Sequence, residues 1–218
     1  MIPKRLYTTW IGCPGVDIYT DAHRALFAKC YASWRRLMPD YALTIITREN
    51  VFDAGWDPLV AEWYERGLAI VNWAEPAWLR KFGGIYLDMD VEAVQRFDTL
   101  REAQCFVGRE SDGFVNTSIH GAVAGHSFAA TLMDLSKEAD VGNQNEGGPR
   151  LYTKLLKQWG WDGTDRTQTI RGITVHKSDV LYPYLWTERF TPDCVMPDTM
   201  AIHHWASTWQ PKAELVDA

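Results

Sequence analysis

Apolar and polar positions follow two different periods along this chain, and the two kinds of segment alternate. A broad apolar stripe at helical spacing predicts a helix over residues 23–38, which Pro39 ends. Short runs of β-forming residues predict strands before and after it. The expected strands are 5–10, 41–47, 85–87, 105–109, 118–124 and 173–176, and the expected helices are 23–38, 58–66, 73–82, 127–138 and 149–159. This alternation indicates an α/β fold with a mostly parallel sheet.

The stretch that carries chemistry is the apolar strand 85–87 with its flanks. Gly83-Gly84 precedes it, and Asp88 and Asp90 follow at its carboxyl end, where ligands of open α/β sheets bind. In an extended chain these two side chains leave the same face, ~6.5 to 7 Å apart at the backbone. Carboxylates in this arrangement suit Mg²⁺ or Mn²⁺, ions that also hold substrate phosphates. The alternative interpretation is a strand followed by an acidic turn that merely solvates the chain.

Length, charge and cysteine content narrow the classes of protein. A chain of 218 residues predicts a single domain over residues 1–218. A net charge of −6 excludes a sequence-wide field that would attract nucleic acid. The four cysteines are scattered without metal-binding spacing, which favours a reduced, cytoplasmic protein. No apolar run reaches the ~18 residues of a membrane span, so any membrane contact is expected to be peripheral.

Several short motifs, in register over nearly the whole chain, resemble one family. Together they are similar to the retaining, GT-A-fold glycosyltransferases with a DXD sugar-binding region. That subgroup includes mannosyltransferases and bacterial capsule or lipo-oligosaccharide transferases, and is distantly similar to the glucosylating domains of large bacterial toxins. The motifs are Ile2-Pro3-Lys4, Trp10-x-Gly12, Gly83-Gly84-Ile85-Tyr86-Leu87-Asp88-x-Asp90, Gly148-Pro149 and His203-His204-Trp205-x-Ser207-x-Trp209. The resemblance implies a Rossmann-like GT-A domain with helices on both faces of the sheet.

The resemblance also implies a metal clamp. Asp90 would ligate Mn²⁺ or Mg²⁺ directly, and His204 stands where relatives carry a third ligand. Asp88 would face the sugar, the ribose or a metal-bound water. The alternative for His203-His204 is an edge-strand pair packed on tryptophans.

Other positions would contact a nucleotide-sugar donor. Trp10 would lie against the base, with Thr9 and Gly84 as further donor contacts, unless Trp10 is a core residue. Ser207 and Trp209 would bond the diphosphate from a C-terminal segment that closes over the donor. Asn116 would contact the sugar or the acceptor, or it is an ordinary turn residue.

One pair of residues departs from the family pattern. Relatives carry an Asp and, three residues later, an Arg before Gly-Gly, where this chain has Asn72 and Glu75. Asn can still bond hydroxyls, but Glu reverses the charge of the expected Arg. Asn72 and Glu75 are therefore expected at the donor sugar, favouring a neutral hexose or pentose. The alternative is that Glu75 pairs with Arg80 or Lys81 on a solvated helix face.

These observations predict a metal-dependent glycosyltransferase in which Asp88, Asp90, Asn72 and Glu75 act at the reacting sugar. Its partners would be a nucleoside-diphosphate sugar and a glycan, glycolipid or other hydroxyl-bearing acceptor. One alternative is a relative with little or no turnover that binds carbohydrate or nucleotide sugar. The other is an Asp-x-Asp phosphotransferase, which the mid-chain motif and Glu92 disfavour.

Overall fold

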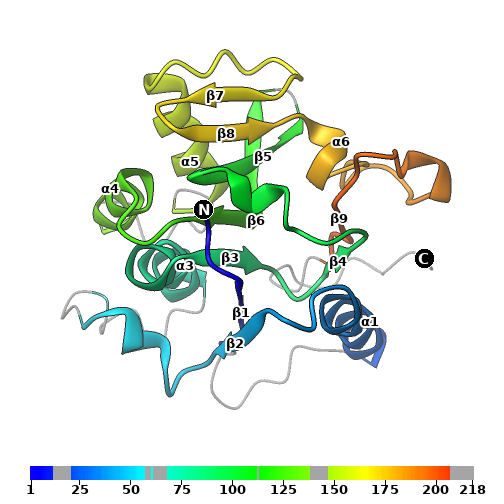
Figure 1. The fold of residues 1–218 in the computed structure, drawn as a ribbon, viewed down its shortest axis with the longest axis horizontal. Coiled ribbons are helices and arrows are strands. Elements are labelled where there is room, and N and C mark those ends of the chain that lie inside the picture. The colour runs from blue at the N-terminus through cyan, green and yellow to red at the C-terminus, as the bar shows by residue number, and fades with distance from the viewer. Residues whose placement is uncertain (12–20, 57–59, 61–67, 112, 138–146, 207–218) are drawn as a thin grey trace.

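The computed structural model describes residues 1–11, 21–56, 60, 68–111, 113–137 and 147–206. Within them, a sheet of seven strands has the order β2-β1-β3-β6-β5-β8-β7, from bottom to top in Figure 1. Strands β2, β1, β3, β5 and β8 run in one direction, and β6 and β7 run in the other. The strands are β1 (Arg5–Thr9), β2 (Ala42–Ile46), β3 (Gly84–Leu87), β5 (Cys105–Ser111), β6 (Phe114–Ala122), β7 (Gln168–Ile170) and β8 (Ile173–His176). The predicted α/β class with a mostly parallel sheet is confirmed.

Two hydrophobic clusters cover the two faces of the sheet, because successive strand residues point to opposite sides. Tyr86 lies in one cluster, whereas Ile85 and Leu87 lie in the other. The first cluster contains residues of α3, α4 and α5, which gather to the left of the sheet in Figure 1, while α1 and α6 lie to its right. The helices are α1 (Asp21–Leu37), α3 (Leu68–Phe82), α4 (Ser127–Ser136), α5 (Pro149–Gln158) and α6 (Ser178–Leu181). Among them, none is long and apolar enough to cross a membrane.

A second, smaller sheet pairs β4 (Val91–Ala93) with β9 (Ala201–His203) in antiparallel fashion. It brings the end of the described chain back to the segment that follows Asp90. The apolar pattern did not predict β4, since three residues carry too little periodicity to be recognised. Strand β9 agrees with the alternative of an edge strand at His203-His204, because His203 ends the strand and its ring lies 4.1 Å from that of Trp205. Three short 3₁₀ helices complete the described structure: η1 (Val51–Ala54), η2 (Leu100–Glu102) and η3 (Pro192–Cys194).

One expected helix begins earlier than predicted, and another lies almost wholly outside the described residues. Helix α3 begins at Leu68 instead of residue 73, so Pro76 lies inside the helix and not in its first turn. Proline has no N–H to donate to the carbonyl four residues earlier, which here belongs to Asn72. The expected helix 58–66 lies almost wholly outside the described residues.

The Gly83-Gly84 pair makes the turn from α3 into β3. Gly83 has φ +63° and its N–H bonds the carbonyl of Leu79 at 2.9 Å, which closes the helix. Gly84 has φ +143°, and a Cβ there would lie 2.6 Å from Tyr7 Cε2. The pair is therefore explained by the close packing of β3 on β1.

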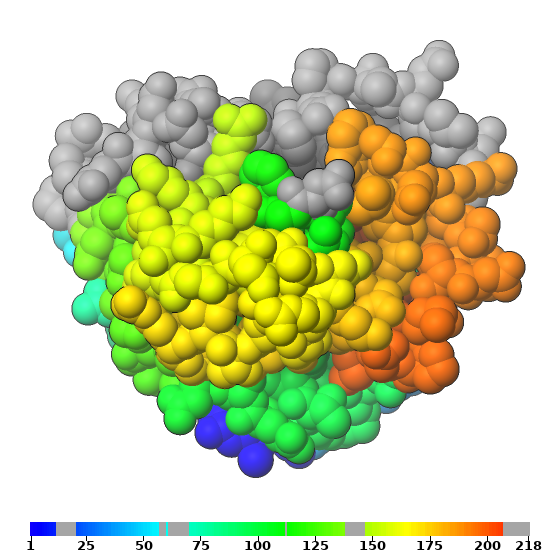
Figure 2. Space-filling model, turned by 90° about the horizontal axis from the view of Figure 1, so that it is seen from above, coloured from blue at the N-terminus to red at the C-terminus, as the bar shows by residue number. Residues whose placement is uncertain are grey.

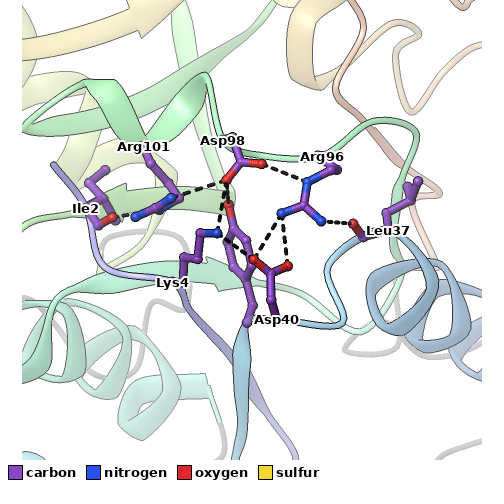
Figure 3. Close-up of polar contacts among 8 residues, drawn as sticks. Ile2, Lys4, Leu37, Asp40, Arg96, Asp98 and Arg101 are labelled. Carbon is purple, nitrogen blue, oxygen red and sulfur yellow. Dashed lines mark hydrogen bonds and ion pairs between the residues drawn. The ribbon is translucent and has the colours of Figure 1, made fainter.

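Charged side chains join the start of β1 to the end of α1 and to η2 (Figure 3). Arg96 bonds Asp40 at 2.9 Å and Asp98 at 2.7 Å, and Lys4 also pairs with Asp40. Arg101 donates to the Ile2 carbonyl at 2.7 Å. These contacts tie the first residues of the chain to segments some forty and a hundred positions later.

Candidate active site

Two carboxylates and one imidazole meet beyond the carboxyl end of β3. Asp88 follows β3, Asp90 precedes β4, and His203 ends β9. One potential ligand atom from each lies within 4.8 Å of the other two, and Asp90 and His203 are buried. His203 Nε2 is 3.3 Å from Asp90 Oδ2. This is the group of described residues that could hold a metal ion.

The electrostatics of the group suit a cation. Burial and the neighbouring Asp90 charge raise the pKa of Asp88 to about 6. Burial opposes ionisation of Asp90 too, but His203 and a 2.8 Å hydrogen bond from the Ala206 N–H hold its pKa below the usual value. His203 Nδ1 is buried with no hydrogen-bond partner among the described residues. Two crowded carboxylates and a neighbouring imidazole are the donor set that Mn²⁺ or Mg²⁺ would stabilise.

The structure brings His203, and not the predicted His204, to the carboxylates. Consecutive side chains of an extended segment point to opposite sides, so only one of the two can face Asp90. His204 instead places Nε2 2.9 Å from Glu92 Oε2, a carboxylate that also pairs with Lys29 on α1. The histidine pair was recognisable in the sequence, but the β4–β9 register that chooses between its members was not.

A hydrogen-bonded chain of side chains supports Asp88. Tyr86 donates its hydroxyl proton to Asp88 Oδ1 at 2.8 Å, and Thr9 Oγ1 lies 2.9 Å from the same hydroxyl. Thr9 is thus linked to Asp88 through Tyr86, which the sequence pattern indicated only as part of an apolar strand. Tyr86 is fully buried, so its hydroxyl gives Asp88 a defined orientation.

Glu75 is a neighbour of Tyr86 and Asp88, and its side chain is only 4% exposed. Burial, and then the charge of Asp88, raise the pKa of Glu75 well above its usual value, while a hydrogen bond with Tyr86 acts in the opposite direction. A solvated pairing with Arg80 or Lys81 is therefore wrong, since both of those side chains are exposed. Asn72 is half-buried against Gly147 and Gly148, where a Cβ on Gly147 would lie 3.0 Å from Asn72 Nδ2. The Gly148-Pro149 motif thus meets Asn72 at the start of α5.

Asn116 is linked to Asp88 through the backbone of Ser118, in the irregular pair of strands β5 and β6. Its amide donates to Glu110 Oε2 at 2.8 Å and accepts from Ser118 N–H at 2.7 Å, and the Ser118 carbonyl accepts from Asp88 N–H at 2.7 Å. The β5–β6 register shifts between Val107 and Gly108, and the Tyr182 hydroxyl accepts there from the Ile119 N–H at 3.2 Å. Neither Glu110 nor Tyr182 was predicted, because the sheet alone brings them together.

The remaining predicted positions lie at the edges of this region. Trp10 follows β1, is half-buried, and has its ring 6.0 Å from that of Phe27 on α1. Gly84 is accounted for by packing against Tyr7. Ser207 and Trp209 lie outside the described residues, whereas Ile202 and His203, in the expected closing segment, are buried in β9.

Residues 25–107 match the family model described as "Glycosyltransferase sugar-binding region containing DXD motif". The matched segment contains Asn72, Glu75, Asp88 and Asp90. Lactosylceramide 4-alpha-galactosyltransferase of Homo sapiens is 26% identical over 207 residues, which are 89% of this chain and 57% of that enzyme. The Rattus norvegicus enzyme is 28% identical over 141 residues, 59% of this chain and 38% of the relative. The chain spans from 38% to 63% of the length of these curated relatives.

Two solved structures are similar in fold. A glycosyltransferase involved in glycosylation of the major capsid of PBCV-1 superposes with a TM-score of 0.52 at 13% identity, covering 95% of this chain and 96% of that one. The PaToxG glycosyltransferase superposes with a TM-score of 0.50 at 17% identity, covering 72% and 68%. At these identities the likeness shows the fold, and the GT-A architecture implied by the motifs is confirmed.

Proposed function

We propose that this chain, whose residues 25–107 match the family model of glycosyltransferases with a DXD sugar-binding region, is a metal-dependent transferase. It moves a sugar from a nucleoside-diphosphate sugar to an acceptor hydroxyl, with retention of configuration. The observation that carries this proposal is the meeting of Asp88, Asp90 and His203 beyond the carboxyl end of β3.

Asp90 and His203 would hold the metal, and Asp88 would complete the group. A bound Mn²⁺ or Mg²⁺ would supply positive charge that stabilises the departing diphosphate. The protein's own contribution is to orient these ligands. The Ala206 N–H bonds Asp90, and the Tyr86 hydroxyl bonds Asp88. Such supporting contacts commonly change metal affinity or activity 10- to 100-fold.

The donor lies across the ends of β1 and β3 in this proposal. Trp10 takes the base and Thr9 lies near the ribose, while Ser207 and Trp209 contact the diphosphate. Asn72 faces the donor sugar. Glu75 acts on Asp88 through Tyr86. The burial of Glu75 beside Asp88 argues for a neutral hexose or pentose, because a second acidic group would be placed in a site already crowded with carboxylates.

The acceptor is a glycan, a glycolipid or another hydroxyl-bearing molecule. The name of the human relative identifies a glycolipid, lactosylceramide, as the acceptor of that enzyme. Asn116 is the side chain of this chain that we place nearest the reacting sugar on the acceptor side, because it is linked to Asp88 through Ser118.

Donor hydrolysis tests the proposal. The purified protein is incubated with a panel of nucleotide sugars and Mn²⁺, and the released nucleoside diphosphate is measured with and without EDTA. Metal-dependent release supports the transferase. Binding of nucleotide sugar without release indicates a binding protein, and phosphate release from a phosphomonoester without donor cleavage indicates a phosphotransferase. Either of the latter two results contradicts the proposal.

A further inference from the structure

A polar groove opens beside the carboxylate site, between the end of β5 and the segment after α6. Its volume is about 230 Å³. In Figure 2 the yellow β7–β8 region and the orange segment after α6 lie side by side on the face that is shown. The groove is lined by Arg109, Glu110, Ser111, Asp165, Ser178, Tyr182, Pro183, Tyr184, Leu185 and Glu188.

The groove shares its inner wall with the carboxylate site. Glu110 bonds Asn116, and Asn116 is linked to Asp88 through Ser118. The Tyr182 ring lies 6.1 Å from the ring of His203. Tyr184 accepts a 3.2 Å hydrogen bond at its carbonyl from the indole of Trp205. A molecule in the groove would therefore reach the donor sugar from the side opposite to β1.

The charges that line the groove do not cancel. Arg109 pairs with Asp165 at 3.4 Å, and Asp165 also accepts from the N–H and hydroxyl of Ser178. The positive charge of Arg109 is therefore paired with the negative charge of Asp165. Glu110 on the inner wall and Glu188 at the rim have no cationic partner within the described residues, although they accept hydrogen bonds from Asn116 and the Leu185 N–H. Each carboxylate keeps oxygen lone pairs to offer to hydroxyl groups.

Part of the lining is less polar. It consists of Pro183, Leu185 and the largely buried Tyr184. A sugar ring has hydroxyls at its edge and apolar C–H groups on its face, which matches a lining that combines carboxylates with apolar side chains. An acidic ligand would be repelled by Glu110 and Glu188.

We propose that this groove binds the acceptor, and that Glu110 and Glu188 select a neutral glycan end over one that carries a carboxylate or phosphate. The inference rests on the proposed function and adds to it the acceptor class and the residues that discriminate.

The test uses matched acceptors and an internal reference. Transfer is measured to aryl hexosides and to the corresponding aryl uronides, with any donor that the wild-type protein cleaves. The wild type should prefer the neutral member of each pair. In the double variant Glu110→Gln/Glu188→Gln, the ratio of kcat/KM for neutral over acidic acceptors should fall roughly fivefold or more. Glu102→Gln removes an exposed carboxylate outside the groove and should leave the ratio unchanged.

A second pair of variants tests the location. Ser111→Tyr fills the groove and should lower transfer relative to donor hydrolysis roughly tenfold or more. Thr169→Tyr adds the same bulk to the exposed face of β7 and should leave that ratio unchanged. A wild type that cleaves no donor overturns the proposed function itself. If donor is cleaved, the inference alone is overturned when neutral glycosides are neither used nor bound, or when the groove variants leave both ratios unchanged.

Discussion

At the scale of single residues, the site depends on the imidazole of His203, which lies beside the carboxylates of Asp88 and Asp90. Burial, and then repulsion from Asp90, raise the pKa of Asp88 to about 6, and His203 offsets part of that repulsion. Asp88 and Asp90 are each held by a neighbour that does not itself belong to the metal set, namely Tyr86 and Ala206. Substitutions here should therefore act on metal affinity before they act on the fold.

Asp90→Asn should abolish activity while the protein stays folded. The amide oxygen can still accept the Ala206 hydrogen bond, but the negative charge that attracts the cation is lost. We expect turnover to fall on the order of 10²-fold or more. Donor hydrolysis and the circular dichroism spectrum measure the two effects. Full activity of this variant, or of the wild type in excess EDTA, contradicts the metal clamp.

Substitutions of His203 and His204 should have clearly different effects on the Mn²⁺ requirement. His203→Gln should raise the Mn²⁺ concentration that gives half-maximal activity by about 10-fold or more. His204→Gln should leave it nearly unchanged, since His204 bonds Glu92 away from the carboxylate pair. A Mn²⁺ titration of both variants decides the point, and the reverse order would restore His204 as the ligand.

Glu75 is expected to influence donor choice. Glu75→Arg restores the charge that relatives carry, at a position whose pKa already responds to the charge of Asp88. It should change the rank order of nucleotide sugars more than it changes the Mn²⁺ requirement. Glu75→Gln retains the shape of the buried side chain and is the control for folding. An unchanged rank order with similar turnover in the Arg variant would remove Glu75 from the site.

At the scale of elements, the position of Asp88 depends on how closely β3 packs on β1. Gly84 permits that approach, since a side chain there would overlap Tyr7 and the Arg5 carbonyl. The second sheet performs the corresponding task for Asp90, because β9 brings His203 and Ala206 to it. Site geometry is thus set by strand contacts between segments distant in the sequence.

Gly84→Ala should destabilise the protein by about 3 kcal/mol, from backbone strain and overlap together. Gly125→Ala is a matched control, because Gly125 also has positive φ but a Cβ there has nothing within 4 Å. It should cost only the strain, about 1 kcal/mol. Urea unfolding of both variants measures the difference, and equal losses would show that overlap with Tyr7 is relieved by a small shift.

At the scale of the whole molecule, the charged cluster of Figure 3 joins the starts of β1 and β2, which the main sheet already pairs, to residues 96–101, which lie outside the sheet. Asp40 and Asp98 accept bonds from Arg96, and Lys4 and Arg101 approach the same pair. Hydrogen bonds from Lys4 and Arg96 lower the pKa of Asp40 to about 2. The cluster is exposed, so its contribution should be modest and sensitive to salt.

Arg96→Gln should lower Tm at pH 7, and the difference from wild type should vanish in acid. A carboxylate whose folded pKa is depressed stabilises the fold above its unfolded pKa, about 4, and loses that effect as pH falls through about 2. Thermal melts at pH 7, 4 and 2 measure how the Tm difference between the variant and the wild type changes with pH. Arg150→Gln alters an exposed arginine on α5 and should leave Tm nearly unchanged at each pH. A difference that persists at pH 2 would mean that Arg96 acts through its hydrogen bond to the Leu37 carbonyl or its contact with the Tyr41 ring.

Local pattern alone determined much of this protein. The apolar run before Asp88, the glycines that precede it and the alternation of strands with helices predicted the α/β class and put both acids at a strand end. These features follow from neighbouring residues, whose periodicity and backbone restrictions are present in the sequence itself.

Tertiary structure decided which distant groups join those acids. It chose His203 over His204 through the register of two three-residue strands, buried Glu75 under Tyr86, and brought Glu110 and Tyr182 to the far side of Asn116. The β4–β9 pairing and the approach of Tyr182 to Ile119 join segments separated by tens of residues. A shift of one residue in such a pairing reverses which side chains face the site, and no local pattern specifies it.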